Sequence, residues 1–204
     1  MSIGFSYKND EKIFTEKVEN GVPYLEYPLL ADTGLVRHGF STRLGGVSEG
    51  VCSTMNLSFS RGDDESAVRE NYRRMANGVE DDSFVFSMQT HTTNIRVVTS
   101  KDKGKGLTTP LDYSDVDGLV TDEPGLCLTT FYADCVPLFF LDPVKKVIGL
   151  SHSGWRGTVG KIGKKTVEVM RSEYGCHPED ILAAIGPSIC QTCYEVSEDV
   201  IDAF

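Results

Sequence analysis

Three apolar runs of strand length lie close together in the second half of the chain, and they constrain the fold more than any other feature. They cover residues 126–132, 136–141 and 146–151, and polar or turn-forming residues such as Asp142-Pro143 bound each of them. Short apolar runs bounded by turn residues are typical of strands buried in a sheet. We therefore predict that the three runs form adjacent strands of a core sheet.

Strand and helix patterns alternate along the rest of the chain. Asn20-Gly21 favours a hairpin turn between two strands, whereas residues 65–79 and 159–175 carry apolar side chains at helical spacing. Neither an internal repeat nor a Pro- or Ser-rich linker divides the sequence. The simplest account is one mixed α and β domain over residues 1–204.

The charge of the chain argues against a polyanionic partner. Thirty acidic and 20 basic side chains give a formal net charge of −10, which repels phosphate backbones and anionic lipid surfaces. We expect neither nucleic acid nor a membrane as a partner. A small anionic substrate remains compatible, because a few clustered arginines can dominate one pocket of an acidic protein.

The start of the chain predicts a cytoplasmic protein. Met1 to Asp10 lack the basic start and apolar run of a secretory signal, and no later stretch approaches the roughly 20 apolar residues that span a bilayer. In the cytosol the six cysteines would be reduced. Each is then a candidate buried side chain, metal ligand or nucleophile.

Three residues combine into a candidate metal site. His152 ends a predicted core strand, His91 lies within a strand-like segment, and Cys135 opens another strand. Zinc accepts imidazole and thiolate ligands, and a catalytic zinc has three protein ligands and one open position. The intervals between the three residues match no compact zinc motif, however, so on spacing alone buried core side chains are the simpler interpretation.

Other cysteines and two arginines are weaker candidates. Cys190 and Cys193 form a single C-x-x-C without a second pair at zinc-ribbon spacing, which favours structural packing. Arg43 and Arg156 are flanked by glycines that let a backbone approach an anion closely. The alternative is that these glycines only form turns and the arginines pair with surface carboxylates.

Six short motifs, in this order from about residue 35 onward, resemble the YfiH-type laccase-domain family. They are His38-Gly39-Phe40-Ser41-Thr42-Arg43 with Gly45-Gly46-Val47-Ser48, Gln89-Thr90-His91, Asp115-Val116-Asp117-Gly118-Leu119-Val120-Thr121, Ala133-Asp134-Cys135-Val136-Pro137, His152-Ser153-Gly154-Trp155-Arg156-Gly157 and Ile185-Gly186-Pro187-Ser188-Ile189. Six motifs in sequence are far more specific than any one of them.

The resemblance implies a fold, an activity and a ligand set. The fold would be α+β, a mixed layered α/β/β/α sandwich related to the catalytic domain of cytotoxic necrotizing factors. The activity would be that of a purine nucleoside phosphorylase, formerly called a multicopper polyphenol oxidase, that also deaminates adenosine and cleaves methylthioadenosine. The family's zinc ligands match His91, Cys135 and His152, which would also be the catalytic residues.

The resemblance also sets expectations for ligands and for the length of the domain. Purine nucleosides and phosphate would be the partners, with Arg43 and Arg156 as the anion-binding residues, and the sequence carries no signal for an oligomeric state. In the family the domain continues well beyond the position of Phe204, so we expect this chain to be truncated at its C-terminal end.

Three alternatives use the same residues differently. Cys135 could be the thiolate nucleophile of an amide hydrolase that edits peptidoglycan precursors, with a histidine as its base. A copper oxidase is disfavoured, because multicopper sites need many imidazoles and the chain has four histidines. A binding module without catalysis is the third alternative.

Overall fold

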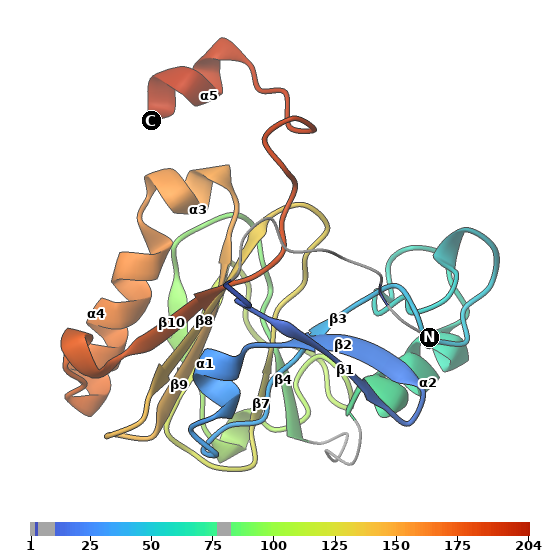
Figure 1. Ribbon diagram of the computed structural model, residues 1–204, viewed down its shortest axis with the longest axis horizontal. Helices are drawn as coiled ribbons and strands as arrows, with labels where there is room; N and C mark the ends of the chain where they lie inside the picture. Colours follow the sequence, from blue (N-terminus) through green and yellow to red (C-terminus); the bar gives the residue numbers. More distant parts are fainter. Residues whose placement is uncertain (1–2, 4–10, 77–82) are drawn as a thin grey trace. The chain divides into compact units, whose positions relative to one another are not determined.

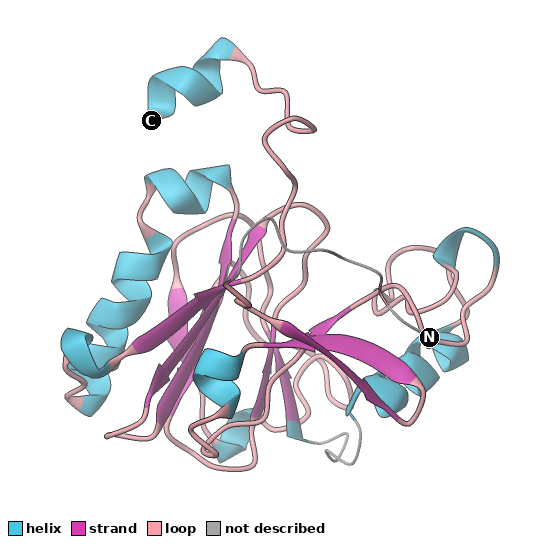
Figure 2. Cartoon of the chain, viewed as in Figure 1, coloured by secondary structure: helices cyan, strands magenta, loops and turns pink. Residues whose placement is uncertain are grey.

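The computed structural model describes residue 3, residues 11–76 and residues 83–204. The chain divides into two compact units, Met1–Asp81 and Asp82–Phe204. Each unit has its own β-structure, and helices accompany both (Figures 1 and 2). The two units do not test whether residues 1–204 form one domain, so the single domain stays a prediction.

The first unit is built on a three-stranded antiparallel sheet. Strand β1 (Thr15–Glu19) pairs with β2 (Val22–Glu26), and β2 pairs with β3 (Phe40–Ser41). Asn20 and Gly21 connect β1 to β2 with φ angles of 49° and 80°. Positive φ at both positions is what a type I′ hairpin turn requires, which confirms the predicted turn. Short helices α1 (Pro28–Ala31) and η1 (Gly50–Cys52) lie in the connections.

Helix α2 (Glu65–Ala76) is the long helix of the first unit. Val68 and Tyr72 are fully or almost fully buried, as the helical spacing of the apolar residues predicts. Residues 77–79 of the predicted helix lie outside the described residues. The buried Asn71 amide donates to Ser48 Oγ at 2.8 Å and accepts from the Val47 backbone at 2.8 Å, so it ties the helix to the preceding loop.

The second unit contains a five-stranded sheet in the order β10-β8-β9-β6-β5, beside a two-stranded parallel pair of β4 and β7. Within the larger sheet β5 and β6 are parallel and the other neighbours are antiparallel. The strands are β4 (Phe84–Phe86), β5 (Ile95–Val97), β6 (Gly118–Thr121), β7 (Cys127–Thr129), β8 (Val136–Asp142), β9 (Val147–Ser153) and β10 (Leu182–Ile185).

The prediction of three adjacent core strands is right for two of them. The runs 136–141 and 146–151 form β8 and β9, which pair along their whole length. The run 126–132 forms β7 and pairs with β4 instead. The strand ends at Thr129, and the N–H and C=O groups of Phe131 bond to the side chain of Gln89 at 2.7 Å each. These bonds use the groups that a longer ladder would need.

The helical region after β9 is broken into two pieces. Helix α3 (Trp155–Val159) begins directly after Gly154, and α4 (Ile162–Tyr174) follows a break at Lys161, where φ is 60°. The helix therefore begins before Gly157, not after it as predicted. Gly175, with φ of 66°, ends α4 as predicted. The other described helices of this unit are η3 (Ser100–Asp102), η4 (Pro178–Asp180) and α5 (Glu198–Ala203).

Alternate residues of β6 show how the second unit is layered. Val120 packs in a cluster with Phe140 and with Met170 of α4. Its neighbour Leu119 packs in another cluster with Val85 of β4. Because successive side chains of a strand point to opposite faces, α4 covers one face of the five-stranded sheet and the β4/β7 pair covers the other. The predicted fold class, a mixed and layered α and β structure, is confirmed.

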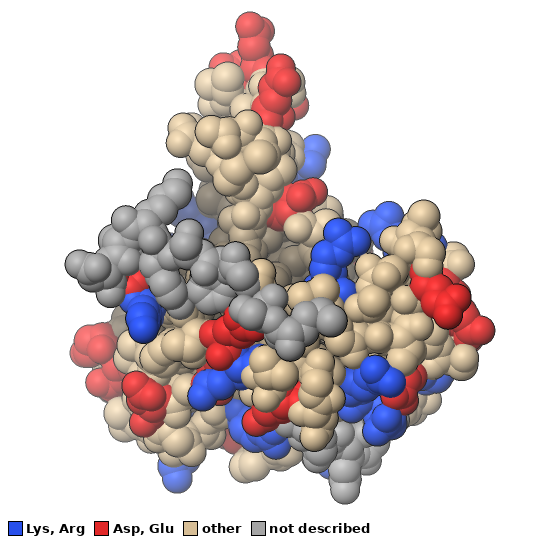
Figure 3. All heavy atoms as spheres, turned by 45° about the vertical axis from the view of Figure 1, so that its right-hand side comes forward, with Lys and Arg blue, Asp and Glu red and all other residues tan. Residues whose placement is uncertain are grey.

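The distribution of surface charge and the length of the helices complete the description of the fold. On the face drawn in Figure 3, acidic and basic side chains are interspersed, and acidic side chains gather on α5. Among the described helices, none has the length and apolar character that crossing a bilayer requires.

The layering predicts the cost of removing a core side chain. Met170 is completely buried between α4 and the sheet, so Met170→Ala should lower the free energy of unfolding by about 2–5 kcal/mol. Val144 is exposed in the β8–β9 turn, so Val144→Ala should change it by less than about 0.5 kcal/mol. Urea denaturation of both variants measures the difference, and equal effects would contradict the assigned core.

Candidate metal centre

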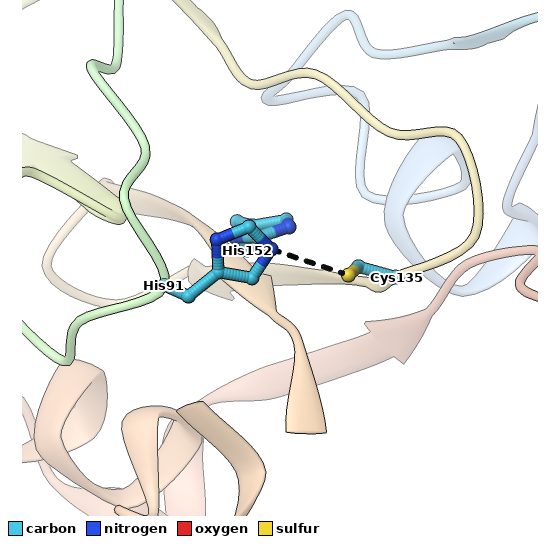
Figure 4. Close-up of side chains that lie close together, drawn as sticks. All are labelled: His91, Cys135 and His152. Carbon is cyan, nitrogen blue, oxygen red and sulfur yellow. Dashed lines mark hydrogen bonds between the residues drawn. The ribbon is translucent and has the colours of Figure 1, made fainter. Parts of the chain in front are cut away.

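The side chains of His91, Cys135 and His152 converge in the second unit (Figure 4). One ligand atom from each lies within 4.8 Å of the other two. The two imidazole rings are 5.0 Å apart at 77°, and His91 Nε2 lies 4.0 Å from Cys135 Sγ. His152 is buried, Cys135 is half-buried and His91 is exposed, so the cluster is open on one side.

His152 is held by the register of β9 and by Asp117. Its ring Nδ1 lies 2.9 Å from Asp117 Oδ1, and its backbone N–H donates to the Asp117 carbonyl at 2.7 Å. A carboxylate at Nδ1 fixes the proton on that nitrogen. Nε2 of His152 is then the nitrogen whose lone pair is available to bind a metal ion.

His91 lies in a loop, which corrects the prediction of a strand there. Its φ of 65° is left-handed, and the same Asp117 carboxylate accepts hydrogen bonds from the backbone N–H groups of Thr90, His91 and Thr92 at 3.2, 3.1 and 2.8 Å. Thr92 Oγ1 adds a bond of 2.7 Å. One buried carboxylate therefore positions both histidines.

Cys135 directly precedes β8, close to the predicted position at the start of a strand. On the adjacent strand β9, His152 is aligned with Pro137, two residues beyond Cys135. Gly154 lies against the cluster: a Cβ atom there would come within 2.8 Å of His91 and 3.2 Å of Cys135 Sγ. A glycine is therefore required for the close approach.

The electrostatics favour a neutral imidazole and an ionised carboxylate. Burial lowers the pKa of His152, and the bond to Asp117 offsets this only in part. Burial would raise the pKa of Asp117, but hydrogen bonds from His152 and Thr92 outweigh it and lower the value. Burial, with Asp134 and Asp117 nearby, raises the pKa of the Cys135 thiol.

This donor set fits a zinc ion. Zinc binds neutral imidazole at about 2.0–2.1 Å and thiolate at about 2.3 Å, so atoms mutually within 4.8 Å need only small side-chain movements to share one ion. Two histidines and one cysteine leave a fourth position open. Among the described residues, this is the one group of three or more His, Cys, Asp or Glu side chains that could hold a metal.

The two predicted anion-binding arginines lie in different units. Arg156 is in α3, four residues after His152, and its guanidinium lies 4.1 Å from the centroid of the Trp155 ring. Arg43 belongs to the first unit, where its Nη2 lies 3.4 Å from the Ser53 carbonyl oxygen. The anion-binding role of both arginines stays a prediction.

Two features of the second unit were not predicted from the sequence. Asp117 belongs to the family motif of residues 115–121, but no role was assigned to it from the sequence. Its position directly before a buried strand could have indicated a buried carboxylate. The assignment of Cys190 and Cys193 to structural packing is wrong, because both side chains are exposed.

Comparison with known proteins identifies relatives. Residues 37–204 match a family model described as multi-copper polyphenol oxidoreductase laccase. Purine nucleoside phosphorylase YlmD from Bacillus subtilis is 41% identical over 170 residues, or 81% of this chain and 60% of that protein. A purine nucleoside phosphorylase from Deinococcus radiodurans is 44% identical over 186 residues, or 90% of this chain and 67% of that one.

A further relative is similar in sequence, and a solved crystal structure is similar in fold. Adenosine deaminase RL5, from an unknown prokaryotic organism, is 37% identical over 169 residues, which cover 81% of this chain and 64% of that protein. The crystal structure of YlmD from Geobacillus stearothermophilus matches with a TM-score of 0.83 and 35% identity. The match covers 94% of this chain and 70% of that one.

The position of Asp117 predicts a specific defect in metal binding. Asp117→Asn keeps one acceptor oxygen but removes the charge, so zinc affinity should fall by about 10–100-fold, as for other residues that orient metal ligands. Competition with a chromophoric chelator measures the affinity, and circular dichroism checks folding. Asp134→Asn removes an exposed charge beside Cys135 and should have a smaller effect. Equal affinities for Asp117→Asn and the unaltered chain would contradict the assigned role.

The raised thiol pKa predicts how metal binding depends on pH. Cys135 is protonated near pH 7 and must lose its proton to bind, whereas His152 is already neutral there because its pKa is lowered. Binding should therefore release about one proton from Cys135, and zinc affinity should rise about tenfold per pH unit around neutrality. Calorimetry in buffers of different ionisation enthalpy counts the protons. Affinity that falls as pH rises would contradict the assignment.

Proposed function

The chain belongs to the multi-copper polyphenol oxidoreductase laccase family, and from this premise we propose that it is a zinc-dependent purine nucleoside phosphorylase that also deaminates adenosine and cleaves methylthioadenosine. The names of its relatives support the two main activities. The observation that carries the proposal is the convergence of His91, Cys135 and His152 around a single position.

Neighbouring residues hold the side chains of the cluster in positions from which they can bind a metal ion. Asp117 orients His152, burial keeps its ring neutral, and the His91 loop is tied to the same carboxylate. Cys135 supplies a thiolate once its proton has left. When bound, zinc would supply Lewis-acid chemistry at the open position, polarising a substrate oxygen or a water molecule. Copper is disfavoured, because the cluster has two imidazoles rather than the many that multicopper sites use.

Phosphorolysis requires a bound phosphate and a stabilised sugar. A phosphate oxygen forms a bond to the ribose C1′ while the bond from C1′ to the purine nitrogen breaks, and the leaving purine takes the proton that the hydrogen phosphate gives up. Positive groups positioned for the phosphate lower the barrier. We assign this role to Arg156, held on the Trp155 ring, and to Arg43. In the deamination, water replaces the amino group of adenosine and ammonia leaves.

The alternative of a cysteine-dependent amide hydrolase has less support. It needs a Cys135 thiolate without a metal and a histidine that accepts the thiol proton. Burial and two nearby aspartates instead raise the pKa of the thiol, which reduces the thiolate fraction near neutral pH. The 4.0 Å between Cys135 Sγ and His91 Nε2 is also the outer limit of a sulfur hydrogen bond.

The remaining parts of the proposal concern partners and location. A net charge of −10 supports small-molecule partners, purine nucleosides and phosphate, rather than nucleic acid or an anionic membrane. The free thiols of the cysteines support a cytoplasmic location. The match to the Bacillus subtilis relative covers 60% of that protein's length. Each activity of the whole protein is therefore a proposal for this chain.

Product analysis tests the proposed activities. The metal-loaded chain is incubated with adenosine, with and without phosphate, and products are identified by mass. Adenine and ribose 1-phosphate should form only with phosphate, whereas inosine should form in both samples. Methylthioadenosine with phosphate should yield adenine.

Matched substitutions assign the activity to the cluster. Cys135→Ser should lower kcat/KM by about 100-fold or more, at least as much as the loss of an orienting residue. Cys52→Ser, in the first unit, should leave it unchanged. A metal-loaded chain that converts no nucleoside, together with a metal-free chain that hydrolyses a peptidoglycan precursor, would favour the amide hydrolase.

A further inference from the structure

A second pair of cysteines lies outside the metal centre. Cys190 and Cys193 have their sulfurs 3.1 Å apart, and the Cys193 N–H donates to the Cys190 carbonyl at 3.0 Å. This turn between β10 and α5 is visible in the C-terminal part of Figure 1, and both side chains are exposed. The two thiols are therefore adjacent and accessible to a reagent in solution.

The surroundings of Cys190 favour its thiolate. Thr192 Oγ1 lies 3.2 Å from Cys190 Sγ. Hydrogen bonds from Thr192 and Cys193 lower the pKa of Cys190 to about 7. About half of the Cys190 side chains are then ionised at neutral pH, whereas an unperturbed thiol with a pKa of about 8.5 is only a few per cent ionised. The thiolate is the reactive form of cysteine.

A structural zinc is a weaker explanation of this pair. Such a site uses four protein ligands. Within residues 11–76 and 83–204, the one cluster of three or more candidate ligands is His91, Cys135 and His152, which includes neither Cys190 nor Cys193. A metal at the pair would therefore have two protein donors.

We propose that Cys190 and Cys193 form a reversible dithiol–disulfide site that exchanges with small disulfides such as glutathione disulfide. The Cys190 thiolate attacks one sulfur of the small disulfide, which forms a mixed disulfide and releases one thiolate. Cys193 then gives up its proton, and its sulfur attacks Cys190 Sγ and releases the second thiolate. The protein loses two hydrogen atoms, and the small disulfide is reduced to two thiols.

The backbone connects this site to the metal centre. The Gly186 N–H donates to the Pro137 carbonyl at 2.9 Å, and the Ile189 N–H donates to the Asp134 carbonyl at 3.0 Å. Cys135 follows Asp134 in the sequence, and Cys190 follows Ile189. Oxidation of the C-x-x-C thus takes place on a segment that is hydrogen-bonded to the backbone beside a predicted metal ligand. The proposal itself does not depend on the identity of the metal or on the proposed activity.

Mass spectrometry of the full chain tests the proposal. The chain is equilibrated in mixtures of reduced and oxidised glutathione, alkylated, and cleaved after Glu179 and Glu195. The peptide of residues 180–195 contains Cys190, Cys193 and no other cysteine. In oxidising mixtures it should carry no alkyl group and weigh two hydrogen atoms less than the reduced peptide. Reduction should restore two alkyl groups.

Two further measurements separate a functional pair from two unrelated thiols. In the Cys193→Ser chain, glutathione should remain attached to Cys190, because the second attack is blocked. In the reduced chain, the alkylation rate of Cys190 should reach half its maximum near pH 7. The proposal is overturned if both thiols stay fully alkylatable in oxidising mixtures, or if each carries its own glutathione without a bond between Cys190 and Cys193.

Discussion

The buried carboxylate of Asp117 is the group on which the candidate site depends. It accepts hydrogen bonds from the His152 ring and from the backbone of residues 90–92, and it has no exposed surface. A buried charge is costly unless its hydrogen bonds are satisfied. The folding of the His91 loop, the tautomer of His152 and the ionisation of Asp117 are therefore one coupled arrangement.

This arrangement links the fold to the chemistry. The β8–β9 ladder places Cys135 near His152, while Asp117, just before β6, brings in the loop that carries His91. The three candidate metal ligands thus come from the second unit alone. Of the two arginines proposed for phosphate, Arg156 belongs to the same unit and Arg43 to the other.

Local patterns predicted much of this structure, and long-range pairing was harder to predict. The hairpin turn, α2 and the β8 and β9 strands were predicted from turn residues, apolar runs and periodicity. Family motifs singled out His91, Cys135 and His152, which lie together, and their role as metal ligands stays a prediction. The pairing of β7 with β4 was missed, because an apolar run does not reveal its neighbour. The loop conformation of His91 was missed as well, since its left-handed backbone is stabilised by Asp117, which is distant in sequence.

The alignment of Pro137 with His152 in the β8–β9 hairpin has a consequence for how such a centre can arise. Side chains alternate between the faces of a strand, so shifting this alignment by one residue would turn His152 to the opposite side of the sheet. The positions of two of the three candidate ligands are therefore set by one contiguous hairpin. The turn at its far end, with exposed Val144, can tolerate changes in length and sequence without moving either ligand.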